Sequence, residues 1–449
     1  MGLILIVLFF IVEAACAVVS ISKKYEKKEW SKLRFVARAA ELLVLLAFVL
    51  TPLADLGMRF FVCFIWLLLR VVISVVVALI ARNSTKNISA VRIVCSTLFS
   101  LVLVSFTLVP AFVFTGYTGL ETSGEYAIAE TSCILVDNSR EETFETDGSK
   151  REVPMHMFYP ETDGSEQFPL IVFSHGAFGY YQSNMSVYQE LASNGYVVLA
   201  LDHPYHAMYT SDTEGKTITV DPMFMQNVMR INSDQTPESE IFRVTTEWME
   251  LRCADVNFVL DACIDAKANG LKPETWFASE EELAVIDSVL KKTDCDTIGL
   301  MGHSLGGATS VTVGRMRDDV DAVIDLDGTM LGEQLDYQND TYQYYEESYP
   351  IPLLEIQAED HYEQAKEYDI LYVNQKVMQN AQDGRCTYFK QSDHMNFTDL
   401  PLFSPVLAKM LGVGAIDPEA CIKQVNEIVL SYYDYYLKNE GELVLKECY

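Results

Sequence analysis

The sequence is short of positive charge after its first quarter, and it contains no C-x-x-C pair. Residues 117–449 hold 21 Lys/Arg against 58 Asp/Glu, whereas residues 1–116 hold 12 against 5. The acidic part would repel phosphates, so we expect no nucleic acid partner. Three of the ten cysteines lie in the apolar first part, which leaves an odd number in the acidic part. No disulfide framework is predicted from this pattern.

Four apolar stretches precede residue 116, and each has close to the roughly 20 residues that cross a bilayer. They lie at about 2–21, 37–54, 60–81 and 91–115. The first contains Glu13 and is the weakest candidate, so three spans remain the alternative to four. Arg70, in the third stretch, is expected to snorkel to the interface or to pair inside a helical bundle, and the alternative is that it marks a functional site.

Basic residues gather in two of the connections between these stretches, one at 23–38 and the other at 82–92. By the positive-inside rule, both connections face the cytoplasm. The sequence therefore predicts a multi-pass protein of the cell membrane. Its membrane region is expected at 1–116, and a separate domain at 117–449 is expected outside the cytoplasm.

From about residue 130, expected strands alternate with expected helices. The strands are predicted at 155–159, 170–174, 196–201, 298–301, 322–326, 353–357 and 386–389, and the helices at 182–194, 239–268, 279–292, 362–380 and 417–438. Such alternation is typical of a mostly parallel sheet with helices on both faces. The acidic stretch 205–240 is too long for a plain connection, so it is either a lid or rim over a substrate site or a solvated insertion.

Ser304 stands in a G-x-S-x-G sequence between an apolar strand and an Ala/Gly-rich helix, the context of a nucleophile elbow. Side chains at Gly302 or Gly306 would clash in so tight a turn. The helix that follows directs its N–H groups and positive dipole end to the place where an oxyanion would form, and the N–H of Leu305 is the first donor there. Ser304 is therefore the predicted nucleophile.

A serine nucleophile needs a base, and the base needs a carboxylate to orient it. His394, in a loop after a strand downstream of Ser304, is the predicted base. His361 abuts a strand end and is expected to be an ordinary surface residue. Two carboxylates remain candidates for the acid: Asp327 closes the strand after the elbow, and Asp360 closes the next strand. Position alone slightly favours Asp360.

The oxyanion needs a second N–H donor. Residues 173–179, Phe-Ser-His-Gly-Ala-Phe-Gly, follow an apolar strand, and the N–H of Ala177 is the predicted donor. The alternative is a glycine-rich turn with no chemical role. The run Asp-His-Pro-Tyr-His at 202–206 contains metal-ligand types but is interpreted as a loop that lines the pocket. We therefore predict no metal and no cofactor.

These residues resemble the platelet-activating-factor acetylhydrolase family, the secreted and type II intracellular lipases. The resemblance covers about residues 150–400. It rests on Phe-Ser-His-Gly at 173–176, Leu-Ala-Ser-Asn-Gly-Tyr-Val-Val-Leu-Ala at 191–200 before an Asp-His, Gly-His-Ser-Leu-Gly-Gly at 302–307, Leu-Asp-Gly at 326–328 and His-Met-Asn-Phe-Thr-Asp at 394–399.

The resemblance implies an α/β-hydrolase fold, no metal, and hydrolysis of phospholipids with short or oxidised acyl chains. It also implies Asp327 rather than Asp360 as the acid, with Leu305 and Ala177 as the oxyanion donors. The apolar stretches depart from the family, whose members need no spans. The enlarged segment 205–240 would frame the acyl pocket and leaves the substrate open.

The sequence thus predicts an α/β-hydrolase domain preceded by an all-α transmembrane region. Its expected activity is that of a serine carboxylic-ester hydrolase that passes through an acyl-enzyme. Its expected partners are a small-molecule or lipid ester and the lipid bilayer. The alternatives are an acyltransferase or peptidase with the same triad, and an inactive membrane-bound scaffold or binding protein.

Overall fold

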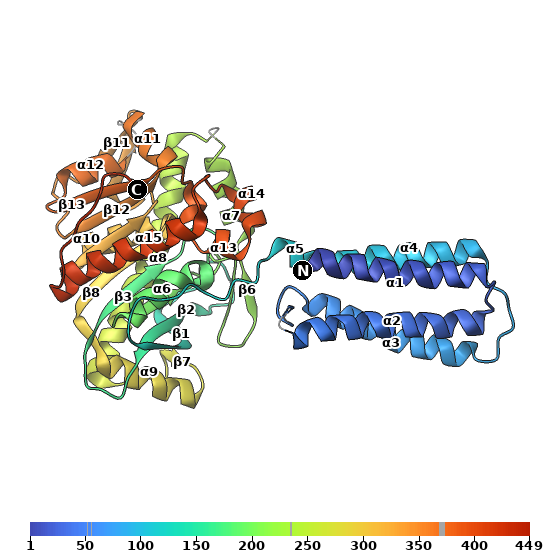
Figure 1. The fold of residues 1–449 in the computed structure, drawn as a ribbon. Coiled ribbons are helices and arrows are strands. Elements are labelled where there is room, and N and C mark those ends of the chain that lie inside the picture. The colour runs from blue at the N-terminus through green and yellow to red at the C-terminus, as the bar shows by residue number, and fades with distance from the viewer. Residues whose placement is uncertain (52, 55, 234–235, 368–372) are drawn as a thin grey trace. The chain divides into compact units, whose positions relative to one another are not determined.

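The computed structural model describes residues 1–449 except 52, 55, 234–235 and 368–372. The chain divides into two compact units (Figure 1). The helical unit comprises Met1–Thr118 and Leu402–Leu407. The sheet unit comprises Gly119–Pro401 and Ala408–Tyr449.

The helical unit is built from long apolar helices. They are α1 (Gly2–Ser22), α2 (Lys27–Leu50), α3 (Phe61–Ala81) and α4 (Ala90–Thr107), followed by the short α5 (Pro110–Val113). In the described part of the chain, α1, α3 and α4 are long and apolar enough to cross a membrane. The first stretch, expected to be the weakest, has a mean hydropathy of 2.9 and is among the three. The second stretch is not, because α2 begins in the basic segment.

The buried charges of this unit pair with one another. Arg70 of α3 forms ion pairs with Glu13 of α1 and, at 2.8 Å, with Glu41 of α2, and all three side chains are buried. Ser100 of α4 donates a hydrogen bond to Glu13. An ionised group removed from water needs such partners. Of the two expectations for Arg70, pairing inside the bundle is therefore confirmed.

The sheet unit contains a nine-stranded mixed sheet. In spatial order its strands are β13 (Gly384–Phe389), β12 (Leu353–Ala358), β9 (Ala322–Leu326), β8 (Thr293–His303), β3 (Phe168–Ser174), β4 (Val197–Leu201), β2 (Lys150–Glu161), β1 (Ala127–Glu141) and β7 (Trp276–Phe277). Strands β13 to β4 pair in parallel, and β2, β1 and β7 add antiparallel pairs. The mostly parallel sheet is confirmed. The strand β1 was not predicted, because its polar residues obscure its short buried centre.

Two hydrophobic cores lie on opposite faces of this sheet. Leu170 and Val172 of β3 belong to one core, and Ile171 and Phe173 to the other. This alternation is the period of two that a strand imposes on its side chains. The first face is covered by α8 (Glu238–Asn269), α9 (Glu280–Lys292) and α10 (Leu305–Met316), and the second by α6 (Met185–Ser193) and α15 (Pro418–Tyr433) (Figure 1).

Two predicted segments include residues outside the described part. Segment 205–240 contains the hairpin β5 (Tyr209–Ser211) and β6 (Thr217–Thr219) and then α7 (Pro222–Ile231), while 234–235 are not described. In place of one helix at 362–380 there are α11 (Glu359–Glu367) and α12 (Val373–Asn380), and 368–372 are not described. The remaining elements are η1 (Tyr181–Asn184), η2 (Leu331–Glu333), β10 (Gln334–Gln338), β11 (Thr341–Tyr344), η3 (His394–Phe397), α13 (Leu400–Phe403), α14 (Pro405–Leu411) and η4 (Asp434–Lys438).

Candidate active site

Ser304 stands at the turn between β8 and α10. Its φ of 56° lies in the left-handed region that side chains rarely adopt, so the turn is strained. A Cβ on Gly306 would lie 1.9 Å from the carbonyl oxygen of Ser174, and a Cβ on Gly302 would lie 2.3 Å from the backbone of Gly306. No side chain fits at such distances. The strand, turn and helix that a nucleophile elbow requires are therefore all present.

The loop after β3 lies beside this serine, because a Cβ on Gly176 would be 3.1 Å from the Cβ of Ser304. In the part of the chain that the structure describes, the backbone N–H groups of Ala177 and Leu305 have no protein acceptor. Free N–H groups at the start of a helix and in an adjacent loop are suited to hold an anion. Their role as an oxyanion hole stays a prediction.

Asp327 follows β9 and contacts His394. Its Oδ2 is 2.7 Å from His394 Nδ1, and its Oδ1 accepts a hydrogen bond of 2.7 Å from the N–H of Ala358. Burial alone would raise the pKa of Asp327, but its contacts with His361 and His394 outweigh burial and hold that pKa well below its usual range. Asp360 is exposed at the start of α11 and, among the described residues, makes no contact with His394. The geometry therefore favours Asp327 over Asp360.

His394 is tied to the elbow through the residue before the serine. The Nε2 of His303 donates a hydrogen bond of 3.2 Å to the carbonyl of His394, and the two ring centroids are 4.5 Å apart. His303 is buried, and burial together with the neighbouring His394 lowers its pKa to about 3. Within the described residues, the hydroxyl of Ser304 makes no hydrogen bond. The structure thus joins His394 to Asp327, while the step from Ser304 to His394 stays a prediction.

His361 shares the carboxylate of Asp327, so the expectation of an ordinary surface residue was wrong. Its Nδ1 is 2.9 Å from the same Oδ2, although its N–H is not aligned for a hydrogen bond. Burial would lower the pKa of His361, but the interaction with Asp327 outweighs burial and raises it to about 9. The reason for the contact is local: α11 begins directly after β12 and brings its first turn over the end of β9.

Asp327, His361 and His394 also form the one group among the described residues whose spacing suits a metal ion, with ligand atoms within 4.8 Å of one another. Their chemistry suits a different role. The Nδ1 atoms of both histidines face the carboxylate, and an imidazole nitrogen that carries a proton has no lone pair for a metal. These residues are better described as an anion that accepts a hydrogen bond from His394 and forms an ion pair with His361.

The run 202–206 is buried behind the glycine-rich loop, where we expected it to line a pocket. The Nε2 of His203 is 2.7 Å from the hydroxyl of Ser174, and its Nδ1 is 2.9 Å from Asp255. The backbone N–H of His203 donates to Nε2 of His175, so the proton of His175 is on Nδ1 and is donated to the carbonyl of Gly176 at 2.6 Å. Burial and the nearby charge of Arg252 lower the pKa of His203 to about 4, so its ring is neutral.

Arg252 of α8 forms hydrogen bonds to the same glycine-rich loop. Its guanidinium is fully buried and donates to the carbonyls of His175 and, at 3.3 Å, of Gly176. The carbonyl of Gly176 and the N–H of Ala177 belong to one trans peptide group, so they point in opposite directions. Fixing that carbonyl therefore fixes the direction of the N–H.

Sequence reasoning missed Arg252 and Asp255. Their spacing of three residues places both charged side chains on one face of α8. This spacing was the signal in the sequence that could have indicated a shared role. It does not show whether that face is buried. Asp255 also accepts hydrogen bonds from the buried Arg151 at 3.0 and 2.7 Å. Because Arg151 lies on β2, these bonds connect α8 to β2.

Comparison with known proteins is consistent with this geometry. The model of the family "Platelet-activating factor acetylhydrolase, isoform II" matches residues 144–445, about two thirds of the chain. The chain belongs to this family. The assignment expected from the motifs is confirmed.

Two curated relatives of this family are platelet-activating factor acetylhydrolases. The protein from Gallus gallus is 28% identical over 287 residues, covering 61% of this chain and 63% of the relative. The protein from Cavia porcellus is 24% identical over 285 residues, covering 61% and 58%. The chain therefore matches less than two thirds of the length of either relative.

A ferulic acid esterase from Streptomyces cinnamoneus has a similar structure. The TM-score is 0.50 at 18% identity, over 73% of this chain and 95% of the esterase. Together with the mixed sheet and its flanking helices, this likeness confirms the α/β-hydrolase fold.

We predict that Gly306→Ala destabilises the sheet unit by about 3 kcal/mol, because the new methyl group would overlap the Ser174 carbonyl at 1.9 Å. Urea unfolding of the purified chain measures this change. Met316→Ala is the matched control, since Met316 is 60% exposed at the end of the same helix and should change stability by less than about 0.5 kcal/mol. Equal midpoints for the two variants would contradict the packing described here.

We also predict a pH-dependent contribution of His361 to stability. Its folded pKa of about 9 exceeds the ordinary value of 6.5, so the contribution is complete below about pH 6.5 and is lost as the pH rises through 9. An ion pair of this kind, with one partner partly exposed, contributes about 1 kcal/mol. His361→Gln should therefore be less stable than wild type at pH 6 and equal to it at pH 9.5.

Urea midpoints measured across this pH range test the prediction. His156→Gln is the control, because His156 lies on β2, beyond β8, β3 and β4 from Asp327 in the sheet. A stability difference between wild type and His361→Gln that does not change with pH would show that the Asp327 contact is not an ion pair.

Proposed function

We propose that this chain is a serine carboxylic-ester hydrolase anchored in a membrane, acting on lipid-like or short-acyl esters. The observation that carries this proposal is the hydrogen bond of 2.7 Å between Asp327 and His394, next to the strained turn at Ser304. A histidine oriented by a buried carboxylate beside an elbow serine is the arrangement that activates a hydroxyl nucleophile. Membership of the acetylhydrolase family supports the same chemistry.

In the proposed mechanism, His394 accepts the proton of Ser304 while the serine oxygen attacks the ester carbonyl. The N–H groups of Leu305 and Ala177 hold the negative oxygen of the tetrahedral intermediate. His394 returns the proton to the leaving alcohol, and an acyl-enzyme on Ser304 remains. Water then gives a proton to His394 while its oxygen attacks the acyl carbon. The bond between that carbon and Ser304 Oγ breaks, His394 returns the proton to the serine oxygen, and the acid is released. Asp327 keeps the ring in one orientation and stabilises its protonated form.

Membrane anchoring is supported by the lengths and apolar composition of α1, α3 and α4. The two basic connections lie at one end of the helical unit, since the N–H of Lys27 donates to the carbonyl of Lys86 at 2.8 Å. By the positive-inside rule that end faces the cytoplasm. The chain leaves α4 at the opposite end, which supports the proposal of a multi-pass protein whose sheet unit lies outside the cytoplasm.

The segment 205–240 is the proposed rim of the acyl site. Phe224 of α7 is buried against His206 and lies 5.5 Å from Phe178, the residue after Ala177. Met223 and Met229 of the same helix are about 60% exposed. Methionine side chains are flexible and adapt to apolar ligands of varied shape. This segment therefore joins an adaptable apolar surface to the oxyanion loop.

We predict that a fluorophosphonate probe labels the full chain in membranes and that Ser304→Ala abolishes labelling. Asp327→Asn should slow labelling and ester hydrolysis by about 10⁴-fold, the usual cost of losing the orienting carboxylate. Asp360→Asn is the matched control and should react like wild type, because Asp360 is exposed and makes no contact with His394 among the described residues.

An ester panel with an added alcohol acceptor then separates hydrolysis from acyl transfer. A folded wild-type chain that is not labelled would refute the serine mechanism. Loss of labelling in Asp360→Asn, with Asp327→Asn active, would move the acid to the next strand.

We further predict that Arg252 is a positioning residue for the oxyanion hole. Arg252→Lys keeps a charge but cannot bond both loop carbonyls, so kcat should fall by about 10- to 100-fold with little change in KM. Arg243→Gln is the matched control on the same helix, since that side chain is 60% exposed. Equal kcat values in folded variants, or a loss confined to KM, would contradict this role.

A further inference from the structure

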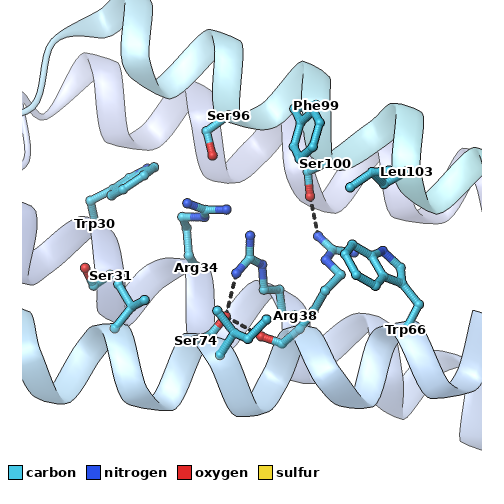
Figure 2. A pocket seen from close by; sticks show the side chains of 13 residues that line it. Trp30, Ser31, Arg34, Arg38, Trp66, Ser74, Ser96, Phe99, Ser100 and Leu103 are labelled. Carbon is cyan, nitrogen blue, oxygen red and sulfur yellow. Dashed lines mark hydrogen bonds between the residues drawn. The ribbon is translucent and has the colours of Figure 1, made fainter.

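A cavity of about 200 Å³ lies inside the helical unit among α2, α3 and α4. Arg34 and Arg38 of α2 point into it, and Ser96 and Ser100 of α4 lie across from them (Figure 2). A water molecule occupies about 30 Å³ of the liquid, so the space can hold several waters or one phosphate-sized anion. The cavity therefore has both room and polar walls.

Positive charge is in excess around this cavity. The buried carboxylates of Glu13 and Glu41 both pair with Arg70. In the described part of the chain, neither Arg34 nor Arg38 pairs with a carboxylate. Three arginines thus face two glutamates, and one full positive charge has no counter-ion.

Arg38 is the more buried of the two arginines that lack a carboxylate partner among the described residues. Its side chain is only 9% exposed, and one guanidinium nitrogen donates to Ser74 at 2.7 Å. Its Nε has no hydrogen-bond partner among the described residues. A buried donor without an acceptor costs about 1–3 kcal/mol, and more when it is charged. The site as it stands is therefore incomplete without an acceptor.

Arg34 adds a second guanidinium to the same space. It lies over the ring of Trp30 at 4.5 Å, and in the described structure it makes no hydrogen bond to the protein. Such a ring contact holds the planar group in place and leaves its N–H edge free. Arg34 and Arg38 are one turn apart on α2, so their free edges face the same space.

We propose that this cavity binds the phosphate group of an anionic phospholipid, held by Arg34 and Arg38. The guanidinium fork matches two phosphate oxygens, and the Ser96 hydroxyl opposite supplies a further donor. A negative ligand would also neutralise the unpaired charge. This inference rests on the proposed insertion of the helical unit in a membrane and goes beyond the proposed hydrolase activity.

A lipid fits the site better than a free phosphate does. Arg34 lies about 10 Å along α2 from its basic start, and Arg38 about 6 Å deeper, at 1.5 Å per residue. With the basic start of α2 at the membrane surface, Arg34 then lies near the boundary between headgroups and acyl chains on the side of the basic connections, and Arg38 lies one turn below it. Phe99, on the wall of the cavity, is 67% exposed, so acyl chains can pass beside it. Basic pockets between membrane helices on the cytoplasmic side hold such headgroups.

Tryptophan fluorescence provides the test, because Trp30 and Trp66 line the cavity and the chain has four tryptophans. The full chain in phosphatidylcholine nanodiscs is titrated with brominated phosphatidylglycerol or brominated phosphatidylcholine, which quench on contact. We expect brominated phosphatidylglycerol to reach half-maximal quenching at a mole fraction at least about tenfold lower than brominated phosphatidylcholine. Arg38→Gln should reduce this preference for phosphatidylglycerol about tenfold, because a hydrogen bond to a charged group is lost.

Arg82→Gln is the matched control, since it removes the same charge from an exposed position at the same end of the unit. It should keep the wild-type preference, and Arg38→Lys should fall between the two. Equal quenching by both lipids, or equal effects of Arg38→Gln and Arg82→Gln, would overturn the proposal. Displacement of phosphatidylglycerol by equimolar inorganic phosphate would overturn the lipid as the source of the anion.

An alkaline carbonate wash of membranes separates this proposal from the one on which it depends. Release of the wild-type chain would refute membrane insertion itself. Retention of the chain without a lipid preference would refute the phospholipid site and leave the anchor intact.

Discussion

The close approach of two backbones, at the ends of β3 and β8, is the constraint on which the candidate active site depends. Ser174 and Gly302 are partners in the parallel ladder, and the Ser174 carbonyl occupies the space that a side chain on Gly306 would need. The strand that supplies this carbonyl also carries the loop of residues 175–179. One packing contact therefore sets the distance between the serine and the loop, and a single added methyl group would separate them.

Buried charge then fixes the directions of the groups that this contact brings together. Arg252 and the ring of His175 both bond the Gly176 carbonyl, so the N–H of Ala177 in the same peptide group is held pointing the opposite way. At the other end of the site, the carboxylate of Asp327 lies between two imidazoles. His361 stabilises the charge of this anion, and its Nδ1 approaches the same oxygen that His394 contacts. The balance between these two histidines is a property of this chain's α11, since it follows from a helix that starts directly after β12.

The parts of the site that could be predicted from the sequence are those whose chemistry is local. The elbow glycines and the loop at 173–179 each follow from a strand end and a short motif. Position alone slightly favoured Asp360, and the preference for Asp327 came from the family resemblance. Arg252 and His361 could not be found in this way, because their roles depend on contacts with residues far away in the sequence. The same limit applies to β1, which is recognisable as a strand only once β2 lies beside it, and to the bundle, where the weakest predicted span pairs its Glu13 with Arg70.

In both units, several buried charged groups are paired with groups of opposite charge. A few buried polar groups have no such partner. Asp255 is surrounded by Arg151 and His203, and the carboxylates of the bundle are bound to Arg70. Single unpaired atoms occur elsewhere, as at the hydroxyl of Tyr188. What sets the elbow and the bundle cavity apart is that each has two neighbouring donor groups that lack a full set of acceptors among the described residues. Because each such donor costs free energy in the empty protein, an arrangement of several is best explained by a ligand that supplies the acceptors. We propose a transient oxyanion as that ligand at the elbow and a lipid phosphate as that ligand in the bundle.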